Sequence, residues 1–249
     1  MNDDLVAMSH QTSLHGHRSA DRGGLALALF SVVLATACTD RMTSNDDRFG
    51  RSGELIAMSG GEGGARYACV TCHGARGEGN GFDAPRLAGL PTGYLQKQME
   101  DYAAGLRSHE VMRDAARFLD SHERVRVASY YAALQPQAFP LETRPATEET
   151  LAATTPGLYA GTCQPCHGVD GVGSANGPPL NAQPALYLTQ QLQDWQVSKR
   201  RNDGNHVMLK VAQQLRPEEV RQLSLYLSQM PLAQIPLAQI RSRPAPQAR

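Results

Sequence analysis

Apolar residues recur at helical spacing in two distant stretches of the chain, and the two stretches resemble each other. In the first stretch, Leu95, Met99 and Tyr102 stand at i, i+4 and i+7, which places them on one face of a helix. The second stretch has the same spacing at Leu188, Leu192 and Trp195. A repeat of this kind predicts two copies of one helical unit.

A further amphipathic helix is predicted near the end of each copy. Its apolar face is formed by residues 127, 130, 131 and 134 in the first copy and by residues 223, 226, 227 and 230 in the second, with the spacing of a helix that buries one side. Asp120 and Ser121 before the first helix, and Pro217 before the second, are typical of helix starts. Because neither copy contains a convincing strand pattern, the predicted fold class is all-α.

The predicted organisation is two tandem domains, residues 51–134 and 148–230. Between them, residues 135–147 hold three prolines and are predicted to be a linker. The final stretch, 231–249, contains Pro-Leu-Ala-Gln-Ile twice and is predicted to be a disordered tail. A length of 249 residues is enough for two modest domains.

The balance of charge does not point to a nucleic acid or an anionic surface. The chain carries 24 basic and 24 acidic residues, so its composition gives no reason to expect a nucleic acid or an anionic surface as the partner. Aromatic residues make up 6% of the chain, which is little for two small cores. A bound cofactor that fills the core of each domain would account for that shortage.

Two stretches, 69–74 and 163–168, have the form Cys-x-x-Cys-His-Gly, and Cys-x-x-Cys-His is the attachment signature of c-type haem. On one helical turn, residues i, i+3 and i+4 share a face. The two thiols can then bond the two vinyl groups of one porphyrin while the histidine ligates the iron. The predicted covalent attachment residues are Cys69, Cys72, Cys163 and Cys166, and the predicted iron ligands are His73 and His167, for two covalently bound haem c groups.

Other uses of the same residue types remain open for a single copy of the motif. Two thiols and an imidazole also suit zinc or a redox-active dithiol. A pair of disulfides is a further alternative in an exported protein, but it leaves both adjacent histidines without a role. The presence of two copies, 94 positions apart with matching downstream patterns, favours haem.

Methionines downstream of each motif are candidates for the second iron ligand. Met112 lies 39 residues after the first motif histidine and Met208 lies 41 residues after the second, so we predict these two as the thioether ligands, which raise the reduction potential. Met99 corresponds to a leucine in the second copy and is predicted to be a core residue. Ligation by His109 and His206 is the rival, although their offsets from the methionines differ.

Prolines after each motif are predicted to support the histidine ligands. Pro85 and Pro178 follow the motif histidines by 12 and 11 residues. A metal-bound histidine usually donates its other N–H group to a carbonyl or carboxylate, and these prolines can supply the carbonyl. Arg86 is a candidate partner for a haem propionate, because arginine forms charge-assisted hydrogen bonds with carboxylates.

The N-terminus is predicted to be a targeting segment, residues 1–37, followed by a tether over 38–50. A basic flank precedes the short apolar run 25–37, which ends in Ala-Thr-Ala, as in a secretory signal. Cys38 follows in an imperfect lipobox and is a candidate for lipidation, which would attach the protein to a membrane without spanning it. The predicted location is therefore the periplasm, with Cys38 as the candidate anchor.

Beyond these features, the chain resembles the class I dihaem cytochromes c of the c-four type. The likeness rests on the two haem motifs, 85–89 and 94–99 with Met112, and the corresponding 178–180 and 187–192 with Met208. The resemblance implies two cytochrome c folds related by a pseudo-twofold axis, with the haems near each other, and electron transfer in the periplasm. The chain departs from the usual Leu-Ala-Gly-Gln after the proline, with Leu-Ala-Gly-Leu at 87–90 and Leu-Asn-Ala-Gln at 180–183.

Three functions are compatible with this sequence. The leading hypothesis is an electron carrier between redox proteins, a donor and a terminal oxidase or reductase, in which neither haem binds substrate. A fixed cytochrome subunit of a membrane dehydrogenase or oxidase is the alternative. A dihaem peroxidase would need one iron with a displaceable ligand, and the paired Met112 and Met208 argue against it.

Overall fold

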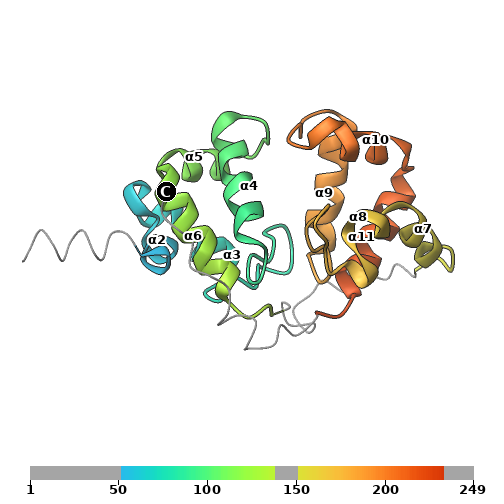
Figure 1. Ribbon diagram of the computed structural model, residues 1–249, viewed down its shortest axis with the longest axis horizontal. Helices are drawn as coiled ribbons and strands as arrows, with labels where there is room; N and C mark the ends of the chain where they lie inside the picture. The colour runs from blue at the N-terminus through green and yellow to red at the C-terminus, as the bar shows by residue number, and fades with distance from the viewer. Residues whose placement is uncertain (1–51, 138–150, 233–249) are drawn as a thin grey trace, which may run out of the picture. The chain divides into compact units, whose positions relative to one another are not determined.

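Helices account for the regular structure of residues 52–137 and 151–232, the parts of the chain that this computed structural model describes (Figure 1). The β structure in these two ranges amounts to an isolated bridge between Ser174 and Gly177. The predicted all-α fold class is confirmed. We call residues 52–137 the first domain and residues 151–232 the second domain.

The first domain contains four α-helices of seven residues or more, two 3-10 turns and one short helical turn. In chain order these are α2 (Gly53–Ser59), η1 (Gly61–Gly63), η2 (Ala65–Tyr67), α3 (Val70–His73), α4 (Thr92–Ala104), α5 (Glu110–Arg117) and α6 (Ser121–Ala133). Helix α4 packs against both α5 and α6, and α2 packs against α6.

The second domain repeats most of this order. Its elements are α7 (Thr155–Thr162), α8 (Gln164–His167), η4 (Val169–Gly171), α9 (Ala185–Gln196), η5 (Gly204–His206), α10 (Val207–Gln214) and α11 (Pro217–Gln229). Helix α9 packs against α10 and α11, and α7 packs against α11. Here α7 leads almost directly into the haem turn α8, whereas two 3-10 turns separate α2 from α3 in the first domain.

The C-terminal helix of each domain begins where the sequence indicates. Asp120 is the N-cap of α6: its side chain accepts a hydrogen bond from the Glu123 amide, and the Glu123 side chain accepts one from the Asp120 amide. This reciprocal pair satisfies two amides that the helix itself leaves without acceptors. Helix α11 begins at Pro217, where the fixed φ of proline suits the first helical residue.

The predicted apolar faces form the two cores. In the first domain Leu95, Val127 and Tyr131 are buried together, and Met99 packs against them. In the second domain the corresponding cluster contains Leu188, Leu223, Leu227 and Met230. The prediction that Met99 and Met230 serve as core residues is therefore confirmed.

Both domains belong to one compact unit, Asp47–Arg249, and side-chain hydrogen bonds join them. The Gln183 side chain accepts a hydrogen bond from the Arg86 amide at 2.9 Å and donates one to the Arg86 carbonyl at 3.0 Å. Gln183 belongs to the segment in which the second copy departs from Leu-Ala-Gly-Gln. Its amide side chain is thus used at the contact between the domains.

Several sequence predictions fall outside the described residues. These are the targeting segment 1–37, the tether 38–50 with Cys38, most of the linker 135–147, and nearly all of the tail 231–249. The predicted domain boundaries stay predictions. Within residues 52–137 and 151–232, none of the helices has the length and hydrophobicity needed to cross a bilayer.

Candidate haem-binding sites

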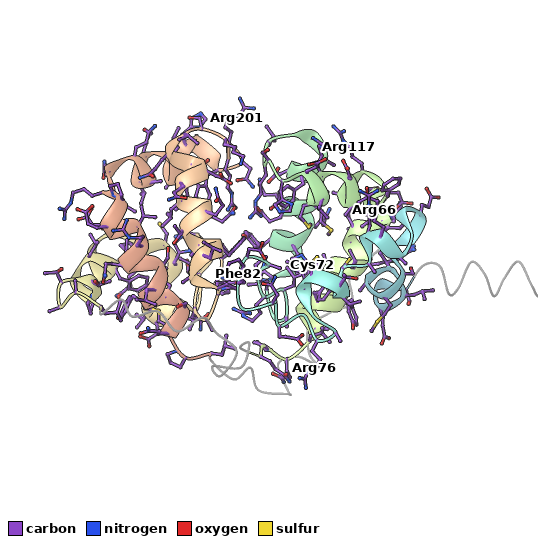
Figure 2. All side chains as sticks on the ribbon, turned by 180° about the vertical axis from the view of Figure 1, so that it is seen from behind. Arg66, Cys72, Arg76, Phe82, Arg117 and Arg201 are labelled. Carbon is purple, nitrogen blue, oxygen red and sulfur yellow. The ribbon has the colours of Figure 1, made fainter. Side chains whose placement is uncertain are left out.

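Each Cys-x-x-Cys-His motif forms one short helical turn with a buried histidine. Cys69 is the N-cap of α3 and Cys163 is the N-cap of α8. The histidines that end these turns, His73 and His167, are 6% and 7% exposed. Cys72 lies at the surface of the same turn as His73 (Figure 2). Each turn therefore offers two thiols and one inward imidazole within five residues.

A proline carbonyl holds each histidine ring. His73 Nδ1 lies 2.9 Å from the Pro85 carbonyl oxygen, and His167 Nδ1 lies 2.8 Å from the Pro178 carbonyl oxygen. A carbonyl can only accept, so Nδ1 carries the proton in both rings. The other ring nitrogen, Nε2, is left with its lone pair, as a metal ligand requires.

Burial keeps both imidazoles neutral. Desolvation lowers the pKa of His73 and of His167 below the usual histidine value, and the hydrogen bonds to the proline carbonyls offset only part of that shift. A neutral imidazole is the form that binds iron. Burial and the hydrogen bond to a proline carbonyl thus act in the same way on both motif histidines.

Glycine-rich loops bring the prolines to the histidines. The Gly79 amide donates to the His73 carbonyl at 2.8 Å, and the Gly173 amide does the same for His167, also at 2.8 Å. Both glycines have a positive φ, 82° and 86°. A Cβ atom at either position would overlap the proline segment that crosses the loop, so these positions favour glycine for both its backbone and its size.

The thiols do not have the surroundings of a redox dithiol or a zinc site. Burial raises the pKa of Cys69 and of Cys163 to about 11, whereas reactive thiols have lowered values. The four motif cysteines are not joined in disulfides. In the described ranges, no three histidine, cysteine or acidic side chains converge in the way that a zinc site needs.

Met112 and Met208 occupy equivalent places at the start of equivalent helices. Met112 lies in the first turn of α5 and Met208 in the first turn of α10, and both are half-buried. Their amides are capped differently. The Met112 amide donates to His109 Nδ1 at 3.3 Å, whereas the Met208 amide donates to an Asp203 carboxylate oxygen at 2.8 Å. Ligation of iron by these two thioethers stays a prediction.

The rival histidines have other surroundings. His109 is exposed, and its Nδ1 serves as the helix cap just described. His206 is also exposed and has a left-handed backbone, with φ of 56°. Both histidines are the N-cap residues of their helices. Their side chains are exposed, whereas those of Met112 and Met208 are half-buried, which favours the methionines as ligands.

Sequence reasoning missed a set of polar residues that link the domains. Arg107 and Gln98 of the first domain form side-chain hydrogen bonds with residues of the second, and Arg200 and Gln191 do so in return. A signal was available, because the two glutamines are separated by 93 positions and so are the two arginines. The Arg86 guanidinium donates to the carbonyls of Ala88 and Asn181, and its role as a propionate partner stays a prediction.

The residues present fit a covalently bound haem in each domain. Each site combines a buried neutral imidazole with a free Nε2, two thiols without a disulfide, and a carbonyl that fixes the ring. When bound, haem iron supplies one-electron oxidation and reduction. The attachment residues would be Cys69 and Cys72 in the first domain, and Cys163 and Cys166 in the second.

Comparison with known families identifies both domains. The family model described as "Cytochrome c" matches residues 62–130 and 152–231. Each match contains one haem motif, one proline after it and one candidate methionine. The two matches together cover more than half of the chain.

Individual relatives share this two-domain arrangement. The chain is 36% identical over 185 residues to the "Thiosulfate dehydrogenase electron acceptor" of Stutzerimonas stutzeri (strain A1501), a match that covers 71% of this chain and 85% of that protein. The crystal structure of reduced recombinant cytochrome c4 from Pseudomonas stutzeri superposes with a TM-score of 0.58 at 28% identity, covering 65% of this chain and 93% of that one.

A larger solved structure also matches. It is that of the thiosulfate dehydrogenase (TsdBA) from Marichromatium purpuratum in its "as isolated" form, with a TM-score of 0.58 and 34% identity. The match covers 72% of this chain but 40% of that one. The present chain therefore corresponds to less than half of that protein.

Proposed function

The chain belongs to the cytochrome c family, as a dihaem electron carrier of the cytochrome c4 type, and from this premise we propose that it accepts electrons from a thiosulfate dehydrogenase. The observation that carries this proposal is the 36% identity to a protein described as the electron acceptor of such an enzyme. The match to TsdBA at 34% identity supports the same partner.

In this function the chain's residues hold and tune two one-electron centres. Cys69, Cys72 and their counterparts fix each porphyrin covalently, so that the cofactor does not dissociate during repeated cycles. His73 and His167 would ligate the irons, with rings fixed by the carbonyls of Pro85 and Pro178. Two such centres let one chain take up two electrons before it meets an acceptor.

We propose Met112 and Met208 as the second protein ligands of the two irons. A thioether ligand stabilises ferrous iron and raises the reduction potential, which suits a protein that must accept electrons. It would also leave no ligand position of the iron open to a substrate. Both irons would then exchange electrons without binding substrate.

The direct test is enzymatic reduction of the purified oxidised protein. It would be mixed with a purified thiosulfate dehydrogenase and thiosulfate in a stopped-flow spectrophotometer, and the absorption band of reduced c-type haem would be followed. We expect complete reduction of both haems, and no reduction when either the enzyme or thiosulfate is omitted. An unrelated monohaem cytochrome c of similar potential is the control, and equal rates for the two proteins would contradict the proposal.

A fixed subunit of the dehydrogenase is a second candidate, favoured by the match to part of a larger TsdBA chain. Fold similarity alone does not separate the two forms of the same function. Co-expression with a thiosulfate dehydrogenase and size-exclusion chromatography would separate them. A stable complex at micromolar concentration would identify a subunit, and separate elution with retained electron transfer would identify a free carrier.

The proposed location is the periplasm, the compartment of cytochrome c4-type proteins. The predicted signal over residues 1–37 supports export, and Cys38 is the proposed lipid attachment site. Intact mass spectrometry of the mature protein tests this, because lipidation adds the mass of the acyl groups to a chain that begins at Cys38. The proposed electron acceptor is a terminal oxidase or reductase.

A further inference from the structure

The segment that leads to Met208 is longer than the one that leads to Met112. Ten residues, 197–206, connect α9 to α10, whereas five residues, 105–109, connect α4 to α5. We call residues 197–206 the long loop. Its residues with left-handed backbone are Ser198, Asn205 and His206, with φ of 57°, 54° and 56°. Left-handed backbone is unfavourable for residues other than glycine, so other contacts must hold the long loop in this shape.

Asp203 ties the long loop to the helices on both sides of it. Its carboxylate accepts hydrogen bonds from the Trp195 indole N–H group at 3.2 Å and from the amides of Met208 and Leu209 at 2.8 Å and 3.2 Å. Trp195 belongs to α9 and is 9% exposed. In the part of the chain that the structure describes, Asp203 forms no ion pair. The start of α10, where Met208 lies, is therefore joined to a buried ring of α9.

Asn202, the residue before Asp203, ties the long loop to the first domain. Its side-chain amide donates to Gln98 Oε1 at 2.9 Å and to Asp101 Oδ2 at 2.8 Å. Its carbonyl oxygen accepts a hydrogen bond from Lys97 Nζ at 2.8 Å. All three partners belong to α4. One helix of the first domain thus fixes the residue next to the cap of α10.

The buried side chain of Arg200 joins these two ties. Its Nε–H group donates to Asn202 Oδ1 at 2.9 Å, and its guanidinium lies 3.9 Å from the Trp195 ring centre. A cation over an indole ring is a favourable contact. Arg201, between Arg200 and Asn202, has its side chain at the surface (Figure 2). The tie to the first domain and the tie to the buried ring therefore meet at one guanidinium.

The corresponding contacts in the first domain are weaker. The Met112 amide is capped by His109, whose Nδ1 accepts its hydrogen bond at 3.3 Å. The Tyr102 ring, which corresponds to Trp195, contacts His109 edge-on with the ring centres 6.4 Å apart. Arg107 contacts the second domain through its side chain. Among the described residues, however, His109 itself forms no hydrogen bond with the second domain.

We propose that Asn202 and Asp203 are positioning residues for Met208, and that helix α4 of the first domain helps to hold this methionine on the second iron. Outer contacts of this kind orient a metal ligand. Exchange of Met208 for another ligand would then move the start of α10 and break hydrogen bonds of the long loop. The proposal rests on Met208 as an iron ligand, which is part of the proposed function, and not on the identity of the electron donor.

The contact between the domains and the ligand of the second iron are then coupled. A contact that exists only while Met208 is bound favours the bound state, so its loss makes exchange of the ligand easier. Because linked equilibria are reciprocal, exchange of Met208 should also loosen the contact between the domains. Met112 stays outside this coupling.

The test is imidazole titration of the ferric protein, because imidazole competes with a thioether for ferric iron. In a Met112→Ala background, the near-infrared sulfur-to-iron band reports Met208 alone. Asn202→Ala in that background removes both side-chain hydrogen bonds to α4 without changing a charge. We expect the band to be half lost at an imidazole concentration about tenfold lower, the effect of one to two hydrogen bonds.

Two controls separate positioning from a general loss of stability. Asn176→Ala makes the same change at an exposed asparagine of the second domain, whose side chain forms no hydrogen bond among the described residues, and it should leave the titration unchanged. In a Met208→Ala background the band reports Met112, and there Asn202→Ala should have no effect. A merely structural role would ease the exchange of both methionines.

A change in the first domain keeps the test independent of the folding of the long loop. Lys97→Met removes the hydrogen bond to the Asn202 carbonyl and should lower the imidazole concentration for Met208 about threefold. Lys199→Met is the matched control, because Lys199 also pairs with a buried aspartate, Asp194, but does not contact Asn202. Haem content is measured first, and if Asn202→Ala does not accumulate with two haems, Lys97→Met carries the comparison.

Three results decide the proposal. A gain in imidazole affinity at the second haem alone, for Asn202→Ala and Lys97→Met, would support it. No gain in either variant, or equal gains at both haems, would overturn it and leave the ligand assignment in place. If Met208→Ala does not change the near-infrared band, the ligand assignment of the proposed function fails, and the positioning role fails with it.

Discussion

Both domains hold the motif histidine through a proline carbonyl, at 2.9 Å for His73 and 2.8 Å for His167, but they build the next turn differently. The first domain has Gly89 there with φ of 74°, and the second has Ala182 with φ of 52°. The amides of both residues donate to a carbonyl of the C-terminal helix at 3.0 Å. The backbone path is thus the same, and the second domain adopts it with a residue that disfavours it.

A tyrosine near the first cysteine of each motif also comes from different places. In the first domain it is Tyr131 of α6, whose buried hydroxyl has no partner among the described residues. In the second domain it is Tyr159 of α7, whose hydroxyl donates to the Gly168 carbonyl at 2.6 Å. The contacts that fix the histidine are repeated, whereas the residues that support the motif from behind have diverged.

Replacement of the two methionines should have the largest effect. It tests whether each methionine ligates one iron although the two helices are capped differently. In the ferric protein, Met112→Ala and Met208→Ala should each remove about half of the weak near-infrared sulfur-to-iron band, because each thioether serves one iron. Near-infrared absorption measures this directly. Met99→Leu, which copies the second domain's Leu192, is the control and should leave the band intact. If neither alanine variant changes the band, the ligand assignment is wrong.

Substitutions in the turn after the proline should affect stability much more in the first domain than in the second. Gly89→Ala should lower the free energy of unfolding by about 2 kcal/mol, because left-handed backbone is unfavourable for alanine and a Cβ atom would overlap the Pro136 ring. Ala182→Gly should stay within about 1 kcal/mol of the wild type, since relief of strain is offset by the greater chain entropy of glycine in the unfolded state. Denaturant titration measures both, and equal losses would remove the distinction.

The two tyrosines should differ when the hydroxyl is removed. Tyr159→Phe removes the shorter of two hydrogen bonds to the Gly168 carbonyl, leaving the one from the Gly171 amide at 3.3 Å, and should cost about 1 kcal/mol in the free energy of unfolding. Tyr131→Phe removes a hydroxyl that has no partner in the described part of the chain, so its effect should be close to zero. Each variant is the other's control in the same denaturant titration. A larger loss for Tyr131→Phe would contradict the comparison.

The caps of the methionine helices should give the smallest difference. Asp203 accepts hydrogen bonds from the amides of Met208 and Leu209, and a carboxylate also favours a helix N-terminus. His109 accepts one, at 3.3 Å. Asp203→Ala should therefore lower the free energy of unfolding by about 1 kcal/mol, and His109→Ala should lower it by about half of that. Imidazole competes with the methionine for ferric iron, so a weakened cap should let it bind more tightly. Imidazole titration should therefore show a larger gain in affinity at the second haem for Asp203→Ala than at the first haem for His109→Ala. Equal gains in affinity would count against unequal caps.

Local pattern explains what the sequence predicted well. The helix faces containing Leu95 and Leu188, the starts of α6 and α11, and the haem turns all depend on residues within a few positions of one another. Comparison of the two copies then indicated Pro85 and Pro178, whose carbonyls contact the histidines. Repetition within one chain supplied information that a single domain would not have given.

Contacts between the domains could not be predicted from local pattern or from comparison of the two copies. Arg107 and Arg200 are polar residues after a helix, and periodicity treats such positions as exposed. Only the packing of α4 and α9 residues shows that both are buried and share Gln98 and Gln191. The Arg86 guanidinium also donates to backbone carbonyls of both domains, contacts that its place next to Pro85 in the sequence does not indicate.

We propose that side chains fully ligate both irons, so that electrons alone enter and leave. Addition of carbon monoxide to the fully reduced protein tests it most directly, because carbon monoxide binds ferrous haem only at an open or readily displaced position. We expect neither haem spectrum to change on mixing. Rapid, stoichiometric binding at even one of the two haems would contradict it.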